Sequence, residues 1–167
     1  MAAKKYIALL SGQLVEVQAT DSSAGAGDAG DLVALDGTGK IASNMLPVGV
    51  GEITEAIECT ENLSAGNLVN IYNSSGKKCR KADASTPYRA HGFVLAGYTS
   101  GQTADVYLSG SITGLSSKTP GAAQYLSTGG TLTETAPSTS GHISQEIGYA
   151  ESDTEVAFHP QQPITLA

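Results

Sequence analysis

The chain has 167 residues, a formal net charge of −7 and a pI near 4.8. An acidic chain without a run of basic residues is not expected to bind nucleic acid through phosphate contacts. No segment approaches about 18 consecutive apolar residues, so we expect no membrane span, and the apolar run 6–10 is too short for a signal peptide. These properties predict synthesis in a cytoplasm without secretion by the general route.

The first fifty residues predict a hairpin followed by an arm. Residues 4–19 contain two apolar runs, 6–10 and 14–17, which flank a glycine-containing turn of suitable length. Residues 20–31 are small, polar and rich in glycine, a composition that cannot supply a core. Proline and glycine at 47–51 make a second break. We therefore predict two parts, which are a hairpin and extended arm at 1–51 and a β-barrel or sandwich domain at 52–167.

The second part reads as strand after strand. Residues 52–59 alternate apolar and polar side chains with period two, which predicts one buried face and one face rich in carboxylates. Similar short runs, each bounded by turn-forming residues, predict strands at 68–72, 91–96, 104–108, 143–149 and 156–159. Turns recur about every ten residues, which is typical of a β-sandwich or barrel. The predicted fold class is all-β, a small antiparallel β-barrel or sandwich with an extended Gly-rich N-terminal arm.

Three segments share one order of features: a turn of small residues, a strand, a glycine turn and a return strand. They are residues 29–40, 65–77 and 120–130. Internal duplication would produce such a pattern. Any protein built from hairpins punctuated by glycine produces similar echoes, and we favour that explanation. Both explanations support an all-β chain.

Residues that commonly carry catalysis form no recognisable pattern. His91, His142 and His159 are far apart in the sequence, and no two have the spacing of metal ligands. Each is interpreted as a surface residue or a satisfied residue at a strand end. The chain has no G-x-S-x-G elbow, and 36–40 lacks the spacing of a phosphate-binding loop. The sequence therefore predicts a protein that is not an enzyme, with no catalytic, cofactor-binding or metal-binding residues and no cofactor.

Two groups of carboxylates, in the Gly-rich region and at 52–58, could in principle bind a cation or act in catalysis. The Gly-rich region contains four aspartates, Asp21, Asp28, Asp31 and Asp36, which could offer oxygens to Ca²⁺. Their spacing matches no known calcium loop well, so a solvated loop is favoured over a weak calcium site. A polysaccharide hydrolase would need two carboxylates facing each other across a cleft. Glu52, Glu55 and Glu58 are instead interpreted as the outer face of one strand.

Cys59 and Cys79 are the only cysteines of the chain. A disulfide between them is possible in principle, but one pair is not a disulfide framework. Cys59 lies in an alternating, strand-like run, which favours a buried reduced thiol.

Several segments resemble proteins of tailed-phage particles. Residues 29–41, followed by 45–51, resemble an N-terminal segment of head decoration proteins and some tail-fibre proteins. Residues 63–112 resemble the small β-barrel of phage decoration proteins through the matching stretches 65–69, 81–83, 92–94 and 106–110. Residues 147–164 resemble their closing segment. The chain is thus similar, over most of its length, to the capsid decoration (head cement) proteins of tailed bacteriophages.

The resemblance implies a virion structural protein that binds the outside of the phage capsid and bridges and stabilises major capsid subunits. It implies a location on the capsid surface after synthesis in the host cytoplasm. The implied partners are the major capsid protein and further copies of the chain, as trimers or dimers. No catalytic residues come with it. The alternative is a tail-fibre or receptor-binding accessory protein, whose mark would be a groove lined by some of the seven tyrosines.

Overall fold

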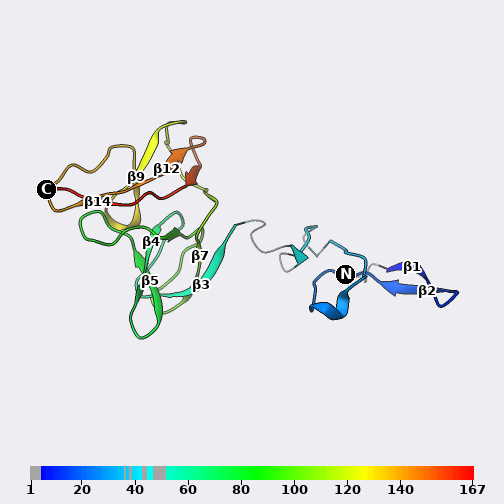
Figure 1. The fold of residues 1–167 in the computed structure, drawn as a ribbon. Helices are drawn as coiled ribbons and strands as arrows, with labels where there is room; N and C mark the ends of the chain where they lie inside the picture. Colours follow the sequence, from blue (N-terminus) through cyan, green and yellow to red (C-terminus); the bar gives the residue numbers. More distant parts are fainter. Residues whose placement is uncertain (1–4, 36, 38, 43–44, 47–51) are drawn as a thin grey trace. The chain divides into compact units, whose positions relative to one another are not determined.

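The computed structural model describes residues 5–35, 37, 39–42, 45–46 and 52–167 (Figure 1). The chain divides into two compact units, Met1–Val50 and Gly51–Ala167, which we call the N-terminal unit and the C-terminal unit. The described residues form short β-strands, turns and single turns of 3₁₀-helix, without an α-helix. The all-β prediction is confirmed.

The N-terminal unit begins with the predicted hairpin. Strands β1 (Lys5–Leu10) and β2 (Gln13–Gln18) pair antiparallel along their full length. The turn residues Ser11 and Gly12 have φ angles of 52° and 82°. A two-residue turn with two positive φ angles matches the twist of the flanking strands, which fixes the register of the pair.

The Gly-rich segment that follows is not an extended arm. The backbone N–H of Thr20 donates to the carbonyl of Leu32 at 2.9 Å, and the N–H of Ala34 donates to the carbonyl of Thr20 at 2.8 Å. These bonds close the segment into a loop that contains the 3₁₀-helix η1 (Ala26–Asp28). Composition predicted that the segment lacks a core, but it could not reveal that its two ends bond to each other. The break predicted at 47–51 lies outside the described residues.

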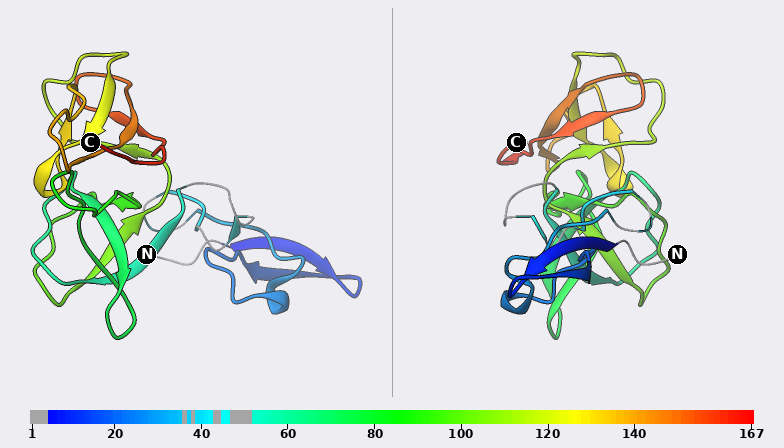
Figure 2. Two further views of the ribbon diagram at one scale, coloured as in Figure 1. Left: turned by 60° about the vertical axis from the view of Figure 1, so that its left-hand side comes forward. Right: turned by 90° about the vertical axis from the view of Figure 1, so that its right-hand side faces the viewer.

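The C-terminal unit contains a closed five-stranded barrel in the order β3-β5-β4-β6-β7 (Figures 1 and 2). Its strands are β3 (Thr54–Cys59), β4 (Leu68–Asn73), β5 (Lys77–Lys81), β6 (Gly92–Phe93) and β7 (Thr103–Tyr107). Four of the five pairings are antiparallel, as predicted. The fifth, between β3 and β5, is parallel and aligns Cys59 with Cys79. A closed ring of five strands cannot alternate in direction throughout, so at least one contact must be parallel, and it is the contact of β3 with β5.

The rest of the unit forms a second sheet in the order β10-β9-β12-β13-β8 and a small pair, β11-β14 (Figure 2). The sheet consists of β8 (Ser111–Ile112), β9 (Ala123–Leu126), β10 (Leu132–Thr133), β12 (Glu146–Ala150) and β13 (Val156–Phe158). The pair consists of β11 (Ile143–Ser144) and β14 (Ile164–Thr165). The strand expected at 143–149 is therefore two strands that belong to different sheets.

Two apolar clusters form the core of this unit. One fills the barrel and includes Ile57, Val69 and Val106. The other cluster joins barrel residues to the second sheet, and it includes Phe93 of β6. The ring of Phe93 lies 5.3 Å from that of Tyr107 in the barrel and 5.1 Å from that of Phe158 in the second sheet, measured between centroids. The aromatic contacts thus join the two sheets of the unit.

A buried amide adds a polar joint. The side chain of Gln145 is 2% exposed, and its Oε1 accepts from the N–H of Ala90 at 2.8 Å. Its Nε2 donates to the carbonyl of Ala90 at 3.1 Å and to the carbonyl of Gln161 at 3.0 Å. All hydrogen-bonding atoms of the amide that face the protein are used, so this side chain links two backbone segments as a strand would.

Gly148 is required by close packing between β12 and β13. Its φ is 148°, and a Cβ atom there would lie 1.9 Å from the carbonyl oxygen of Ala157. We predict that Gly148→Ala destabilises the C-terminal unit by more than about 3 kcal/mol, because strand pairing must separate to admit the methyl group. Urea unfolding measures the loss. Gly97→Ala is the control, since its Cβ would meet ordinary contact at 3.7 Å; equal stability losses in both variants would contradict the packing argument.

Candidate functional site

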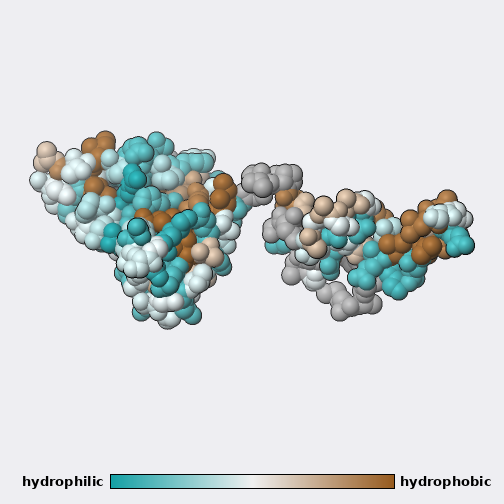
Figure 3. All heavy atoms as spheres, turned by 60° about the horizontal axis from the view of Figure 1, so that its bottom comes forward, coloured by the Kyte–Doolittle hydropathy of each residue, from teal (hydrophilic) through white to brown (hydrophobic). Residues whose placement is uncertain are grey.

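Exposed apolar side chains are concentrated in the N-terminal unit. Of the thirteen large exposed hydrophobic residues among those described, ten lie between Ile7 and Leu46. In the same described segment a single hydrophobic residue, Ala34, is buried. Figure 3 shows hydrophobic side chains gathered over the hairpin. Ordinary soluble domains bury such side chains in a core, and contiguous exposed apolar patches mark interaction sites.

The hairpin is apolar on both faces. Partners across an antiparallel pair share a face, so Ile7, Leu9 and Leu14 lie on one face, with exposed fractions of 63%, 68% and 78%. Leu10 and Val15 lie on the other face, at 52% and 38%. We call these five residues the apolar hairpin surface. The sequence contains a signal for this surface, since 6–10 is a continuous apolar run and not an alternating one, but a run of this length by itself predicts only a strand.

The hairpin also has unpaired edges. Within the described residues, β1 and β2 pair only with each other, so the outer edge of each strand has no partner strand. An isolated two-stranded hairpin is marginally stable in water, and free edges readily pair with another chain. The described part of the N-terminal unit therefore exposes both an apolar surface and strand edges without a partner strand.

The three histidines have separate surroundings. His142 lies near Asp83. Burial acts to raise the pKa of Asp83, but hydrogen bonds from Ser85 and Gly129, together with the charge of His142, lower it. His159 stacks on Tyr149 with a centroid distance of 6.5 Å. His91 contacts β4 and Arg89. In the described parts of the chain no three histidine, cysteine, aspartate or glutamate side chains lie together as a metal site would require.

Four of the predicted carboxylates, Asp28, Asp31, Glu55 and Glu58, have partners within the protein. Asp31 accepts from the hydroxyl of Thr20 at 2.8 Å, and Asp28 accepts from the backbone N–H of Ala24. Asp36 lies outside the described residues. On β3, Glu55 pairs with Lys77 at 2.6 Å, and Glu58 pairs with Lys78. The prediction of one carboxylate face on β3 is wrong: Glu58 lies on the outer face, whereas Glu55 lies on the face of the buried Ile57 and Cys59, because alternate residues of a strand share a face. Both carboxylates pair with lysines of β5.

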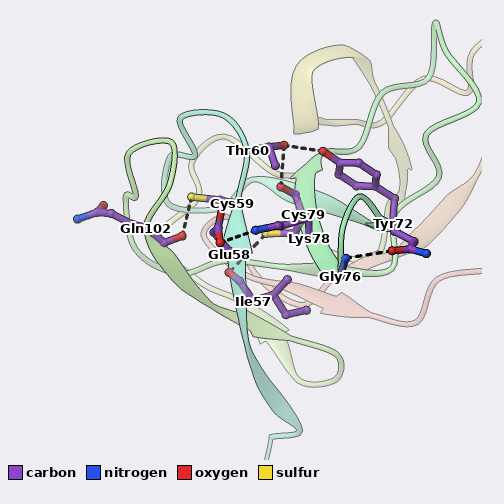
Figure 4. A network of polar contacts seen from close by, with 10 residues as sticks. Ile57, Glu58, Cys59, Thr60, Tyr72, Gly76, Lys78, Cys79 and Gln102 are labelled. Atoms are coloured by element: carbon purple, nitrogen blue, oxygen red, sulfur yellow. Dashed lines mark hydrogen bonds and ion pairs between the residues drawn. The ribbon is translucent and has the colours of Figure 1, made fainter.

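Cys59 and Cys79 are free and buried, which confirms the predicted reduced thiol at Cys59 (Figure 4). The sulfur of Cys59 lies 3.2 Å from the carbonyls of Thr99 and Gln102. Burial, followed by the charges of the neighbouring Cys59 and Glu61, raises the pKa of the Cys79 thiol to about 11. A thiol that stays protonated inside a barrel is a packing residue and not a nucleophile.

His91 completes the hydrogen bonding of β4 beyond the end of β6. Its Nδ1 accepts from the backbone N–H of Ile71 at 2.9 Å, and the Nδ2 of Asn70 lies 3.4 Å from the same atom. On the other side of the ring, the Nε of Arg89 lies 2.8 Å from Nε2. Burial, and then the charge of Arg89, lower the pKa of His91. The ring is therefore a neutral structural acceptor at the edge of the barrel.

Comparisons with known proteins supply no relative. No protein-family model, no curated protein and no solved structure matches this chain. In the described residues, no helix has the length and apolarity needed to cross a bilayer. The candidate site therefore rests on the chain's own geometry, and its strongest feature is the apolar hairpin surface.

We predict that both thiols resist a water-soluble disulfide reagent in the folded protein. Cys59 and Cys79 are each 0% exposed, and the raised pKa of Cys79 removes the reactive thiolate. Ellman's reagent should modify neither thiol in native buffer and both in denaturing guanidinium. Rapid modification of the native protein would show that the barrel opens or that a thiol is accessible.

We predict that stability falls on mild acidification because of His91. Its pKa is lowered in the folded state from 6.5, so the unfolded chain takes up the proton first as the pH falls below that value. The stabilisation is complete above pH 6.5 and is lost toward the lower folded-state pKa. The urea midpoint should drop between about pH 7.5 and 5.5, and drop less in His91→Gln, whose amide oxygen can accept from Ile71. Equal drops would remove His91 as the cause.

Proposed function

We propose that this protein is a structural component of a tailed-phage particle that binds the outside of the capsid and stabilises neighbouring major capsid subunits. The observation that carries the proposal is the N-terminal unit, whose described residues expose large apolar side chains and bury almost none. Such a unit gains its core from a partner. The sequence resemblance described above names the major capsid protein as that partner.

The energetics favour binding through the hairpin. Fully burying one large aliphatic side chain contributes about 1.5–3 kcal/mol, so covering the five residues of the apolar hairpin surface is worth several times that amount. Association itself costs roughly 4–15 kcal/mol. The surface alone therefore supports modest affinity, and pairing of the free strand edges with a capsid strand would add to it.

The division into two units suits bridging. The C-terminal unit has its own core, whereas the N-terminal unit lacks one. Once one unit is bound to a capsid subunit, binding of the other unit to a neighbouring subunit becomes intramolecular, which multiplies modest affinities. Because binding to the assembled shell is lost when subunits separate, it stabilises the shell by mass action. Copies associated as trimers or dimers would extend the same linkage.

The test compares two substitutions that place a glutamate at equally exposed apolar positions. Leu9→Glu alters the apolar hairpin surface, and Ile164→Glu is the matched control in β14, because both side chains are 68% exposed. We expect Leu9→Glu to weaken binding to capsids that lack the protein at least about tenfold, which corresponds to roughly 1.4 kcal/mol. Ile164→Glu should bind as the unaltered protein does. Co-sedimentation with capsids measures binding.

The melting temperature of the particles completes the test. Capsids carrying the unaltered protein or Ile164→Glu should melt at a higher temperature than bare capsids, and capsids mixed with Leu9→Glu should melt as bare ones do. Particles that are equally robust without the protein, but fail to adsorb to cells, would refute the cement role and support the tail-fibre alternative.

A further inference from the structure

A small pocket lies beside the ring of His91 in the C-terminal unit. Its volume is about 230 Å³, and it is lined by Arg89, His91 and Gln145 together with the tail segment 160–163. Arg89 and His91 are two positions apart in the sequence, so their side chains reach the same side of the backbone. Among the lining residues, Arg89 is exposed to solvent.

Hydrogen-bond donors are directed at both ring nitrogens of His91, which is one donor more than a neutral ring can accept. A neutral imidazole carries one N–H donor and one acceptor nitrogen. The backbone N–H of Ile71 occupies Nδ1 as the acceptor, so the proton of the neutral ring resides on Nε2. The Nε–H of Arg89 is directed at this same Nε2 at 2.8 Å, so with the ring proton on Nε2 the Arg89 N–H has no acceptor. Two N–H groups at this separation repel each other, and an anionic oxygen placed beside both would satisfy both.

The other polar groups of the pocket leave this role open. The amide of Gln145 is used up by Ala90 and Gln161. The Nη1 of Arg89 reaches Oε1 of Gln162 at a long 3.5 Å. The residues that line the pocket include no aspartate or glutamate among those described. The pocket thus carries one formal positive charge beside a neutral ring, on a chain whose net charge is −7.

We propose that this pocket is a carboxylate-binding site, in which Arg89 Nε and His91 Nε2 donate to the oxygens of one carboxylate group. A single positive charge matches a carboxylate better than a phosphate, which carries about −1.5 to −2 at neutral pH. The carboxylate belongs either to a small organic acid or to an acidic side chain of a bound protein. Both sources offer the same two oxygens to the site.

The experiment titrates the full-length protein with sodium acetate and follows the ring nitrogens of its histidines by NMR. The signal of His91 Nε2 should move saturably, while those of His142 and His159 stay in place. Arg89→Gln should weaken acetate binding at least about tenfold, and Arg89→Lys, which keeps the charge without an Nε–H, should fall between. Lys118→Gln changes the net charge equally outside the pocket and should bind as the unaltered protein does. Amide spectra confirm that each variant is folded.

The two sources are separated by a second probe, N-acetyl-aspartate amide. Binding at least as tight as that of acetate indicates an acidic protein side chain, and binding of acetate alone indicates a small free acid. Three results would overturn the site: equal shifts with chloride at the same ionic strength, tighter binding of phosphate than of acetate, or acetate binding unchanged in Arg89→Gln.

Discussion

The contact between Phe93 and Phe158 is the interaction on which the C-terminal unit depends. The chain has two phenylalanines and no tryptophan, and both phenylalanines are placed in the cluster that joins the barrel to the second sheet. Aromatic pairs of this geometry contribute roughly 0.5–1.5 kcal/mol beyond the burial of their area. Because β6 has two residues, its place in the barrel is held more by the packing of Phe93 than by its ladder. Both phenylalanines of the chain therefore lie where the two sheets meet.

The sequence predicts the elements better than it predicts their partners. Period-two alternation located β3, and a glycine turn between two apolar runs located the first hairpin, because these signals are local. Partner choice depends on residues far apart in the chain. The parallel contact of β3 with β5, the bridge between Thr20 and Val33, and the division of 143–149 between two sheets are all of this kind. Composition and the spacing of residues do not predict these long-range pairings directly.

The candidate sites follow the same division. The continuous apolar run at 6–10 can be seen in the sequence, but its exposure cannot. Burial depends on contacts with residues elsewhere in the chain, and these are not read from a local pattern. Likewise, the sequence places Arg89 and His91 two residues apart but cannot show that Ile71 fixes the proton of the imidazole. The two units also differ in what holds them. One is maintained by its own aromatic and amide contacts, and the other exposes the apolar surface that a core would need.

The parallel closure of the barrel has a consequence for the order of folding. The β4–β5 hairpin joins residues that are close in sequence, so it can form early. The pairing of Thr54 with Tyr107 joins residues about fifty positions apart, and β3 also pairs with β5. Loop closure of this length is slow, and contacts of this kind lower folding rates. Until the last contact forms, β3 and β5 each present an open edge, and the nascent chain is then most exposed to pairing with its own copies.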